Sequence, residues 1–530
     1  MTTEHKPGRP MNVLFICTDQ QRARDVGFMG NDVVQTPHLD ALAAESMVFD
    51  NAWVSNPVCM PNRSTMLTGR LPSAHGVIFN DRSLDWNVNT VARQFKEAGY
   101  ATGLLGKSHL QHGMSRNAVL SYRGQGSSRS VFPEGWDAIE DGERYIGDPP
   151  VDPDDFYGFD HIELSIDHGA SISGHHLQWA MAKGGDKDSL FIDQDTDTQG
   201  TDRSQHWRQI YRPPYPEDWH STAYVTERTI EFIEHQRKAQ KPFFAWCSFP
   251  DPHHPMTPPG RFFDMYKPKD MPLPRSRHDP LDAAPAHLKQ FAAIHPKDQR
   301  NWVAPCGFGS DELLAEAIAA TYGMISMIDE GVGRIMQTLN QLGIEDNTLV
   351  VFTSDHGDMM GEHGLFLKGF MHYRGTLQVP LLIRRPGQQP GRTSALATTL
   401  DLAPTLLDLA GLARFDGMQG HSLEPCLDGA RRVRSSVLIE DDLPEVTASL
   451  TPMPARTRTL ITPEYRYTVN SKGEQQLFNL GEDPDEMRPI DPTDQLAAEL
   501  RGELVQAMMM ADDSSRGAPT THQFRWQSAH

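Results

Sequence analysis

A cysteine followed closely by a proline and an arginine is the most chemically suggestive feature of the chain. Residues 58–70 read VCMPNRSTMLTGR, with Cys59 two positions before Pro61 and four before Arg63. Such a cysteine can be a small apolar core residue, a thiol nucleophile, or the precursor of another side chain. Pro61 predicts the first turn of a short helix that ends at Gly69. Cys59 then lies near a helix N-terminus, where the dipole favours an anion.

Four further groups of polar residues each follow an apolar run that we expect to be a strand. They are Asp19-Gln20, Lys107-Ser108-His109, the DPHHP segment 251–255, and Asp355-His356. Singly, each group has a structural alternative, because an aspartate after a strand is often a helix N-cap and a lone histidine often only completes the packing. Ligands of open α/β sheets bind beyond the carboxyl ends of the strands, however. Four such groups at one edge indicate a functional site.

A metal site is predicted from carboxylate and amide oxygens and one imidazole, supplied by Asp19, Gln20, Asp355 and His356. This set suits a hard divalent cation such as Ca²⁺, Mg²⁺ or Mn²⁺ better than zinc. Such a cation would lower the pKa of a bound oxygen nucleophile. A thiolate at Cys59 matches a hard cation poorly. The combination favours a residue 59 that becomes an oxygen nucleophile.

These residues must be positioned by the strands and helices around them. The order of the expected elements predicts an α/β domain with a mostly parallel central sheet flanked by helices. Runs typical of buried strands and helical periodicity alternate along the chain. The expected strands are 12–18, 101–107, 242–249 and 347–354, and the expected helices are 37–49, 90–100, 222–236 and 311–342. Thr36 is the expected N-cap of the first helix. Residues 111–216 and 265–305 lack sustained periodicity and are predicted to be long loops over one edge of the sheet.

A change of pattern near residue 431 predicts a second, smaller unit. Short alternating runs indicate an antiparallel sheet, and a helix follows at about 493–510. The expected parts are a catalytic domain at 1–430, a small C-terminal domain at 431–511, and a tail at 512–530. The tail has no core of its own, and its aromatic side chains suggest docking on a neighbouring subunit in a homodimer or tetramer.

Charge and cysteine content restrict the partners and the compartment. The 530-residue chain has a formal net charge of −21, which disfavours nucleic acid or an anionic membrane surface as a partner. The five cysteines are scattered and form no Cys-x-x-Cys motif, which fits a reducing compartment. The sequence shows neither a signal peptide nor a membrane span. We therefore expect a cytoplasmic protein.

The motifs together resemble one known family. The run from Cys59 to Arg63, continued by Thr68-Gly69-Arg70, is similar to the C-x-P-x-R…T-G signature of the sulfatase family, within the alkaline phosphatase superfamily. The resemblance spans nearly the whole chain. Its other motifs are Asp19-Gln20, GKSHL with Lys107 and His109, Pro252 to Pro255, SDHGD at 354–358, Lys368 in GLFLKG, and the C-terminal EQQLFNLGEDPDEMRPI. An alkaline-phosphatase-like fold is implied.

The resemblance also implies a cofactor and a mechanism. In that family the cysteine is oxidised after synthesis to Cα-formylglycine, so a formylglycine-generating enzyme is an implied partner. The hydrated aldehyde would attack the sulfur of a sulfate monoester with the help of one divalent ion, Ca²⁺ or Mn²⁺, and would later release sulfate. The implied metal ligands are Asp19, Gln20, Cys59, Asp355 and His356.

Roles of the neighbouring residues follow from the same resemblance. Arg63 would brace the hydrated aldehyde, and His109 would be the base that breaks the intermediate. Lys107 and Lys368 would bind the nonbridging oxygens of the ester. His253 would protonate or hydrogen-bond the leaving oxygen.

Other histidines and one asparagine near these motifs are assigned less directly. The Pro-His-x-Pro pattern favours His253 over His254, although the pair can be read either way. Asn80 is a further candidate for a substrate contact. Three histidines of the irregular segment are expected to be structural or to set specificity, namely His168, His175 and His176.

One departure from the family pattern bears on the substrate. Gln20 stands where many sulfatases carry a second aspartate, so Asp19 and Asp355 alone neutralise a divalent ion. A less negative site tolerates a more negative substrate. The Asp-Gln pair with Lys368 is also similar to phosphonate monoester hydrolases and choline-sulfatase-like members. We expect sulfate monoester hydrolysis, with promiscuous cleavage of phosphonate monoesters or phosphodiesters as the alternative.

Two readings from other classes stay open at this stage. A thiol hydrolase would use Cys59 and His109 without a metal, and it would survive chelation. A catalytically inactive member would bind a metal or an anion and keep Cys59 unmodified.

Overall fold

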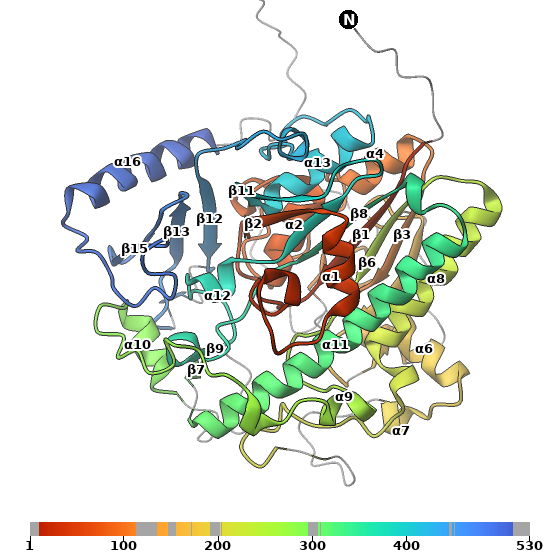
Figure 1. The fold of residues 1–530 in the computed structure, drawn as a ribbon, viewed down its shortest axis with the longest axis horizontal. Coiled ribbons are helices and arrows are strands. Elements are labelled where there is room, and N and C mark those ends of the chain that lie inside the picture. Colours follow the sequence, from red (N-terminus) through yellow and green to blue (C-terminus); the bar gives the residue numbers. More distant parts are fainter. Residues whose placement is uncertain are drawn as a thin grey trace, which may run out of the picture.

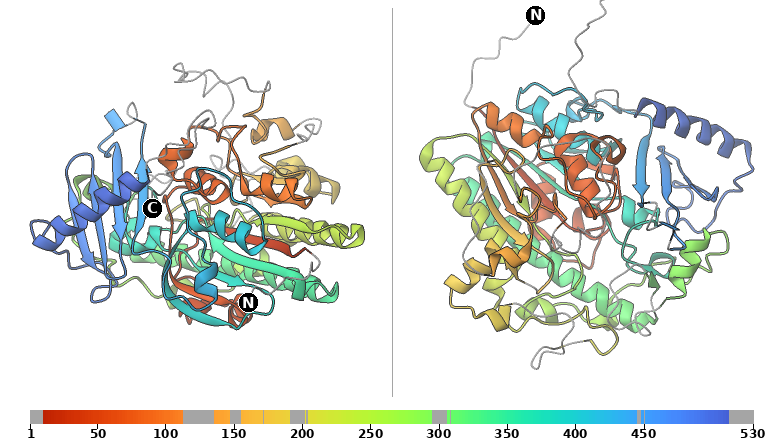
Figure 2. Two further views of the ribbon diagram at one scale, coloured as in Figure 1. Left: turned by 90° about the horizontal axis from the view of Figure 1, so that it is seen from above. Right: turned by 180° about the vertical axis from the view of Figure 1, so that it is seen from behind.

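The computed structural model describes residues 10–112, 135–146, 155–170, 172–190, 202, 204–294, 306–307, 309–444, 448–449 and 451–511. These residues form a nine-stranded sheet, a four-stranded sheet and a two-stranded ribbon. Helices lie on both sides of the large sheet (Figure 1), and in both views of Figure 2 the C-terminal sheet and its helix lie on one side of the molecule. Within the described ranges, no helix is long and apolar enough to cross a membrane.

The middle of the large sheet is parallel, and it brings the predicted polar segments to one edge. The strand order is β11-β2-β10-β8-β1-β6-β3-β4-β5. β1 (Asn12–Thr18) pairs in parallel with β8 (Thr348–Ser354) and with β6 (Phe243–Ser248), and β6 pairs in parallel with β3 (Ala101–Gly106). Every residue of these four strands is buried, as expected of strands covered on both faces. The predicted α/β class and these strands are confirmed.

Two hydrophobic cores sandwich the large sheet. Alternate side chains of β1 point to opposite faces, with Phe15 in one core and Leu14 and Ile16 in the other. The helices over one face are α1 (Pro37–Ala44), α8 (Ser221–Ala239) and α11 (Asp311–Gln341), and those over the other are α2 (Cys59–Thr68), α4 (Val91–Glu97) and α13 (Leu402–Leu409). In Figure 1, α8 and α11 lie side by side across the sheet.

The helix predicted at 37–49 is too long. It ends at Ala44, and the following residues form β2 (Met47–Trp53). β2 pairs with β10 (Leu381–Arg384) in antiparallel fashion and with β11 (Gly391–Thr398) in parallel. Partners more than 300 positions away therefore decide the conformation of this apolar run.

The predicted cap of α1 is also different. Thr36 occupies the N-cap position, but its hydroxyl accepts the N–H of Gly27 at 2.8 Å instead of capping the helix. Asp329 of α11 accepts the N–H groups of His38 and Leu39 at 3.2 and 2.7 Å. A distant carboxylate therefore satisfies the first turn of the helix.

Both segments predicted to be long loops contain regular elements. Residues 111–216 include β4 (His161–Ile166), which extends the large sheet beside β3, and α6 (His175–Ala182). Residues 265–305 include α10 (Ala286–Ala292). The remaining short elements are α3 (Pro72–His75), β5 (Ser173–Gly174), α7 (Lys187–Leu190), α9 (Gly260–Asp264), β7 (Cys306–Gly307), β9 (Leu365–Phe366), α12 (Arg374–Leu377) and α14 (Glu424–Leu427).

The C-terminal region forms the predicted antiparallel sheet and helix. Its strands pair in chain order, as β12 (Val437–Asp442), β13 (Arg456–Ile461), β14 (Tyr465–Asn470) and β15 (Gln475–Asn479). α16 (Gln495–Met510) packs on the sheet through a buried cluster. A second cluster joins β12 and β13 to the β2 and β11 side of the large sheet. The predicted tail at 512–530 lies outside the described residues.

Candidate active site

Cys59 is the first residue of α2, and its side chain is buried. Its Sγ lies 3.0 Å from Nε2 of His356 and 3.8 Å from Oδ1 of Asp19. Every residue of α2 is buried, and Gly69 ends the helix with a φ of 65°, as predicted. Burial and Asp19 act to raise the pKa of the Cys59 thiol, but the surrounding cations hold it well below its ordinary value. The neighbouring cations therefore favour a negative charge on the side chain of residue 59.

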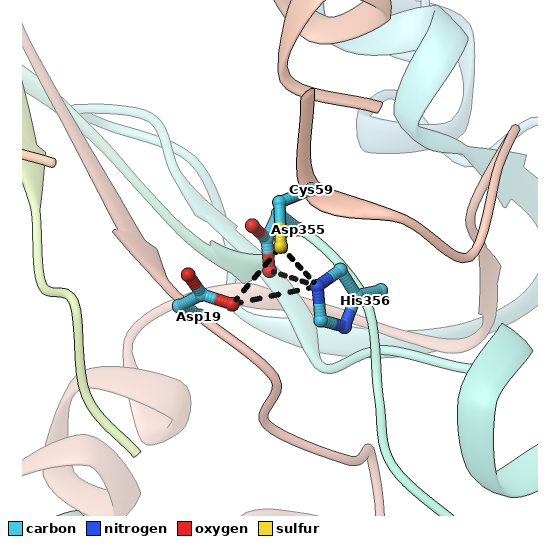
Figure 3. A group of neighbouring side chains, drawn as sticks. All are labelled: Asp19, Cys59, Asp355 and His356. Atoms are coloured by element: carbon cyan, nitrogen blue, oxygen red, sulfur yellow. Dashed lines mark hydrogen bonds and ion pairs between the residues drawn. The ribbon is translucent and has the colours of Figure 1, made fainter. Parts of the chain in front are cut away.

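Four buried side chains from three parts of the chain point their ligand atoms at one another, namely Asp19, Cys59, Asp355 and His356 (Figure 3). These ligand atoms all lie within 4.8 Å of one another. His356 Nδ1 lies 2.9 Å from the carbonyl oxygen of Gly357 and donates there, so Nε2 is the ring nitrogen that faces Cys59 and the carboxylates. Two carboxylates and an imidazole nitrogen form a donor set that fits a divalent cation.

Arg63 and Lys107 hold the two carboxylates. Arg63 Nε donates to Oδ2 of Asp355 at 2.6 Å, and its Nη2 lies 3.7 Å from Oδ2 of Asp19. Lys107 Nζ donates to Asp19. Burial raises the pKa of Asp19, but Lys107 and its other neighbours lower it to well below the usual range. Arg63 also donates through Nη1 to the carbonyl of Lys107 and to Ser248, at 3.1 and 2.8 Å, and so ties α2 to the ends of β3 and β6.

Gln20 links the carboxylate cluster to Lys368. Its backbone has a φ of 66°, and its N–H donates to Oδ1 of Asp355 at 3.1 Å. Its amide oxygen accepts from Lys368 Nζ at 2.8 Å, and its amide nitrogen donates to Asp358. In this arrangement the amide positions a lysine. Metal ligation by Gln20 stays a prediction.

His109 has the properties of a base. Its backbone, with a φ of 55°, donates its N–H to Glu140 at 2.7 Å, and Glu140 also accepts from Leu110 and Gln111. Burial and the nearby Lys107 hold the pKa of His109 well below its ordinary value, so the ring is neutral near pH 7. Its Nδ1 is buried without a hydrogen-bond partner among the described residues. Glu140, which fixes this loop, was not found from the sequence because no motif marks it.

Three histidine rings are stacked beside Asp19. The ring centroids of His168 and His253 are 3.8 Å apart, and those of His253 and His254 are 4.1 Å apart. His168 Nε2 contacts Lys107 Nζ and lies 3.5 Å from Oδ2 of Asp19. The structure therefore brings His168 into the site itself. The sequence analysis expected His168 to be structural or to set specificity, because no motif in the surrounding segment links it to Asp19 and Lys107.

The other two histidines of that segment pack around β4 and α6. His175 Nδ1 accepts the N–H of Leu164 at 3.0 Å, and His176 Nε2 lies 2.7 Å from the carbonyl oxygen of Trp219. These contacts fit the structural role that the sequence suggested.

Asn80 and Lys368 lie at the border of the cluster. Asn80 Oδ1 accepts the N–H of Met60 at 3.1 Å, in the first turn of α2. Both residues line a cavity of about 500 Å³, which Val58, the residue before Cys59, also lines. A substrate held in this cavity would contact both side chains.

Comparison with known proteins decides the family. The family model described as "Sulfatase" matches residues 11–149 and 167–412. The chain belongs to the sulfatase family. A second model, "N-sulphoglucosamine sulphohydrolase, C-terminal", matches residues 361–512. The membership predicted from the Cys59 signature is therefore confirmed.

Individual sulfatases and a solved structure show the same likeness. The chain is 30% identical to an arylsulfatase of Clostridium perfringens over 491 residues, covering 90% of this chain and 89% of that one. It is 27% identical to a choline-sulfatase of Rhizobium meliloti over 518 residues, covering 96% and 87%. The crystal structure of a phosphonate monoester hydrolase of Agrobacterium radiobacter superposes with a TM-score of 0.74 at 26% identity, covering 94% and 95%. The predicted alkaline-phosphatase-like fold is confirmed.

The contacts of His168 predict that this sulfatase needs it for turnover. His168→Ala removes the ring that touches Lys107 and stacks on His253, so we expect kcat/KM to fall by about ten- to hundredfold. Steady-state kinetics on a chromogenic sulfate ester, with thermal unfolding alongside, measures this. The control is His278→Ala, whose side chain is 74% exposed. Equal activities of the two variants would contradict the role of His168.

Proposed function

We propose that the protein is a sulfuric ester hydrolase that cleaves sulfate monoesters, with residue 59 as the nucleophile after its thiol has become formylglycine. The observation that carries this is the position of Cys59 at the start of a buried helix, with Sγ facing Asp19 and His356. The arylsulfatase and choline-sulfatase relatives support the sulfate ester as substrate.

The metal site fits the same function. One divalent ion, Ca²⁺ or Mn²⁺, would be held by Asp19, Asp355, His356 and residue 59, with Gln20 as a further ligand. When bound, the ion supplies Lewis acidity and lowers the pKa of an oxygen nucleophile. Oxygen donors and a single imidazole favour these ions over thiophilic metals.

The remaining polar residues have separate tasks around the ester. Lys107 and Lys368 bind the nonbridging oxygens and offset the charge that develops on them. His253 hydrogen-bonds the leaving oxygen, and Asn80 contacts the substrate beside it. The neutral ring of His109 receives the proton that residue 59 gives up when the product leaves. Arg63 lies on the same helix as residue 59 and donates to Asp355, so it holds the helix against this carboxylate.

Maturation, assembly and location complete the proposal. A formylglycine-generating enzyme would read the Cys59 signature. We also propose a homodimer or tetramer, and the tail at 512–530, from which this was predicted, lies outside the described residues. We place the protein in the cytoplasm, because the four cysteines whose surroundings are described are free and buried, as in a reducing compartment. The net charge of −21 argues against nucleic acid as a partner.

Conversion of Cys59 is the most direct test of the nucleophile. After co-expression with a formylglycine-generating enzyme, we expect mass spectrometry of the peptide around residue 59 to show an aldehyde in place of the thiol. Cys59→Ala should lower kcat by more than about 10³-fold. Cys426→Ala, in the short helix α14, is the matched control and should keep wild-type activity. Fully active protein that retains the Cys59 thiol would refute the proposal.

A second activity is supported by one residue and one relative. Gln20 brings no negative charge to the cluster, and the phosphonate monoester hydrolase of Agrobacterium radiobacter shares the fold at 26% identity. We therefore expect the same site to cleave phosphonate monoesters or phosphodiesters as well as sulfate monoesters. The measurement compares kcat/KM for 4-nitrophenyl sulfate, 4-nitrophenyl phenylphosphonate and bis(4-nitrophenyl) phosphate. Turnover of the sulfate ester alone would remove the second activity and leave the first.

A further inference from the structure

A largely apolar cavity of about 500 Å³ opens directly beside the cluster. Four of its lining residues also belong to the surroundings of residue 59, and one of them is His254, which stacks on His253. Val58 precedes Cys59 in the chain, Asn80 binds the first turn of α2, and Lys368 contacts Gln20. An ester whose sulfur lies at residue 59 therefore has this cavity next to it.

Aromatic and aliphatic side chains form most of the cavity wall. The rings of Phe79 and Phe370 lie 6.3 Å apart at an interplanar angle of 35°. Phe291 of α10 and Met453 of the C-terminal region add further apolar surface. Among the described residues that line the cavity, Lys368 is the only lysine, arginine, aspartate or glutamate. The wall therefore offers an anion contact near the nucleophile and mainly apolar contacts elsewhere.

The C-terminal sheet fixes one side of this wall. Asp441 of β12 is fully buried, and its Oδ2 accepts the N–H of Phe370 at 2.7 Å. His372 Nε2 lies 3.3 Å from the same oxygen, and His372 Nδ1 lies 2.7 Å from Thr459 of β13. The segment that carries both Lys368 and Phe370 is therefore held by two strands of the small sheet, and this wall of the cavity is fixed by the fold.

We propose that this cavity binds the leaving-group side of the ester, and that the preferred substrate is the sulfate of an uncharged, apolar phenol or alcohol with two or more rings. The inference rests on the proposed function. The volume falls in the range of small-molecule sites and exceeds what one phenyl ring fills. The hydroxyl groups of a sugar would give up their hydrogen bonds to water, and the rings of Phe79, Phe291 and Phe370 offer none in return. A quaternary ammonium group would lie beside the Lys368 cation.

Two aryl sulfates of similar leaving-group acidity isolate the contribution of the cavity. We expect kcat/KM for 2-naphthyl sulfate to exceed that for phenyl sulfate by about tenfold, because the second ring gains apolar contacts. Choline sulfate and glucosamine 6-sulfate should be poorer substrates than either. A preference for one of these two, in an active enzyme, would overturn the cavity assignment and leave sulfate ester hydrolysis standing.

Variants of the wall connect the preference to these residues. Phe79→Ala and Met453→Ala change partly exposed side chains, and each should reduce the tenfold naphthyl advantage to about twofold. The inhibition constant of inorganic sulfate should stay unchanged, because sulfate reaches only the anion contacts. Met487→Ala is the matched control, since this methionine is 40% exposed and lies outside the cavity lining. A naphthyl advantage that survives both wall variants would contradict the assignment.

Binding to Cys59→Ala separates this inference from the proposed function. Calorimetry on this variant should show tighter binding of 2-naphthyl sulfate than of phenyl sulfate, without any turnover. Equal affinities would overturn the cavity assignment even if the wild type is an active sulfatase. If the wild type cleaves no sulfate ester while the variant still prefers the naphthyl compound, the proposed function fails and the cavity assignment is supported.

Discussion

Two fully buried carboxylates, Asp19 and Asp355, are the constraint on which the rest of the site depends. They follow neighbouring parallel strands, so the sheet itself sets their spacing. Charges removed from water are stable only with opposite charges and hydrogen bonds around them. Arg63 donates to Asp355 and lies 3.7 Å from Asp19 as an ion pair, while Lys107 donates to Asp19 and the N–H of Gln20 donates to Asp355. The need to compensate two anions therefore fixes the position of α2, and with it the position of Cys59.

The same constraint supports the proposal that residue 59 acts through oxygen and not through sulfur. A sulfur atom at this position faces two carboxylates and His356, which together prefer a hard cation. Oxygen at residue 59 would complete that ligand set. The cations Lys107 and Lys368 contact Asp19 and Gln20 and are the groups that we propose to bind the anionic part of the ester. In the proposed function, one set of buried charges would hold the metal ion, position the nucleophile and bind the substrate.

The sequence was sufficient for the parts of the molecule that depend on local pattern. The four apolar strands and the polar residues that follow them were predictable, because buried parallel strands read as continuous apolar runs. The parts it missed depend on distant partners. The run at Met47–Trp53 becomes a strand only between β10 and β11, and Asp441 meets Phe370 across 71 positions of sequence. His168 lies within an irregular segment whose spacing carries no signal.

Gly106, the glycine of the GKSHL motif, has a structural role that the sequence alone does not show. Gly106 precedes Lys107 with a φ of 111°, and a Cβ there would lie 1.9 Å from the carbonyl oxygen of Ser248. The glycine of the GKSHL motif therefore allows β3 and β6 to approach closely, just before Lys107 and His109, to which we assign roles in catalysis. The motif was recognisable from the sequence, whereas this reason for it required the fold.

Removal and replacement of the divalent ion tests the central claim most directly. Protein with formylglycine at residue 59 would be stripped with a chelator, and its metal content, its melting temperature and its turnover of a sulfate ester would be measured together. With the ion gone, Asp19 and Asp355 lose a compensating charge, so we expect activity to disappear and the melting temperature to fall, and both to return with one equivalent of Ca²⁺ or Mn²⁺. Full turnover by protein shown to contain no divalent ion would contradict the claim.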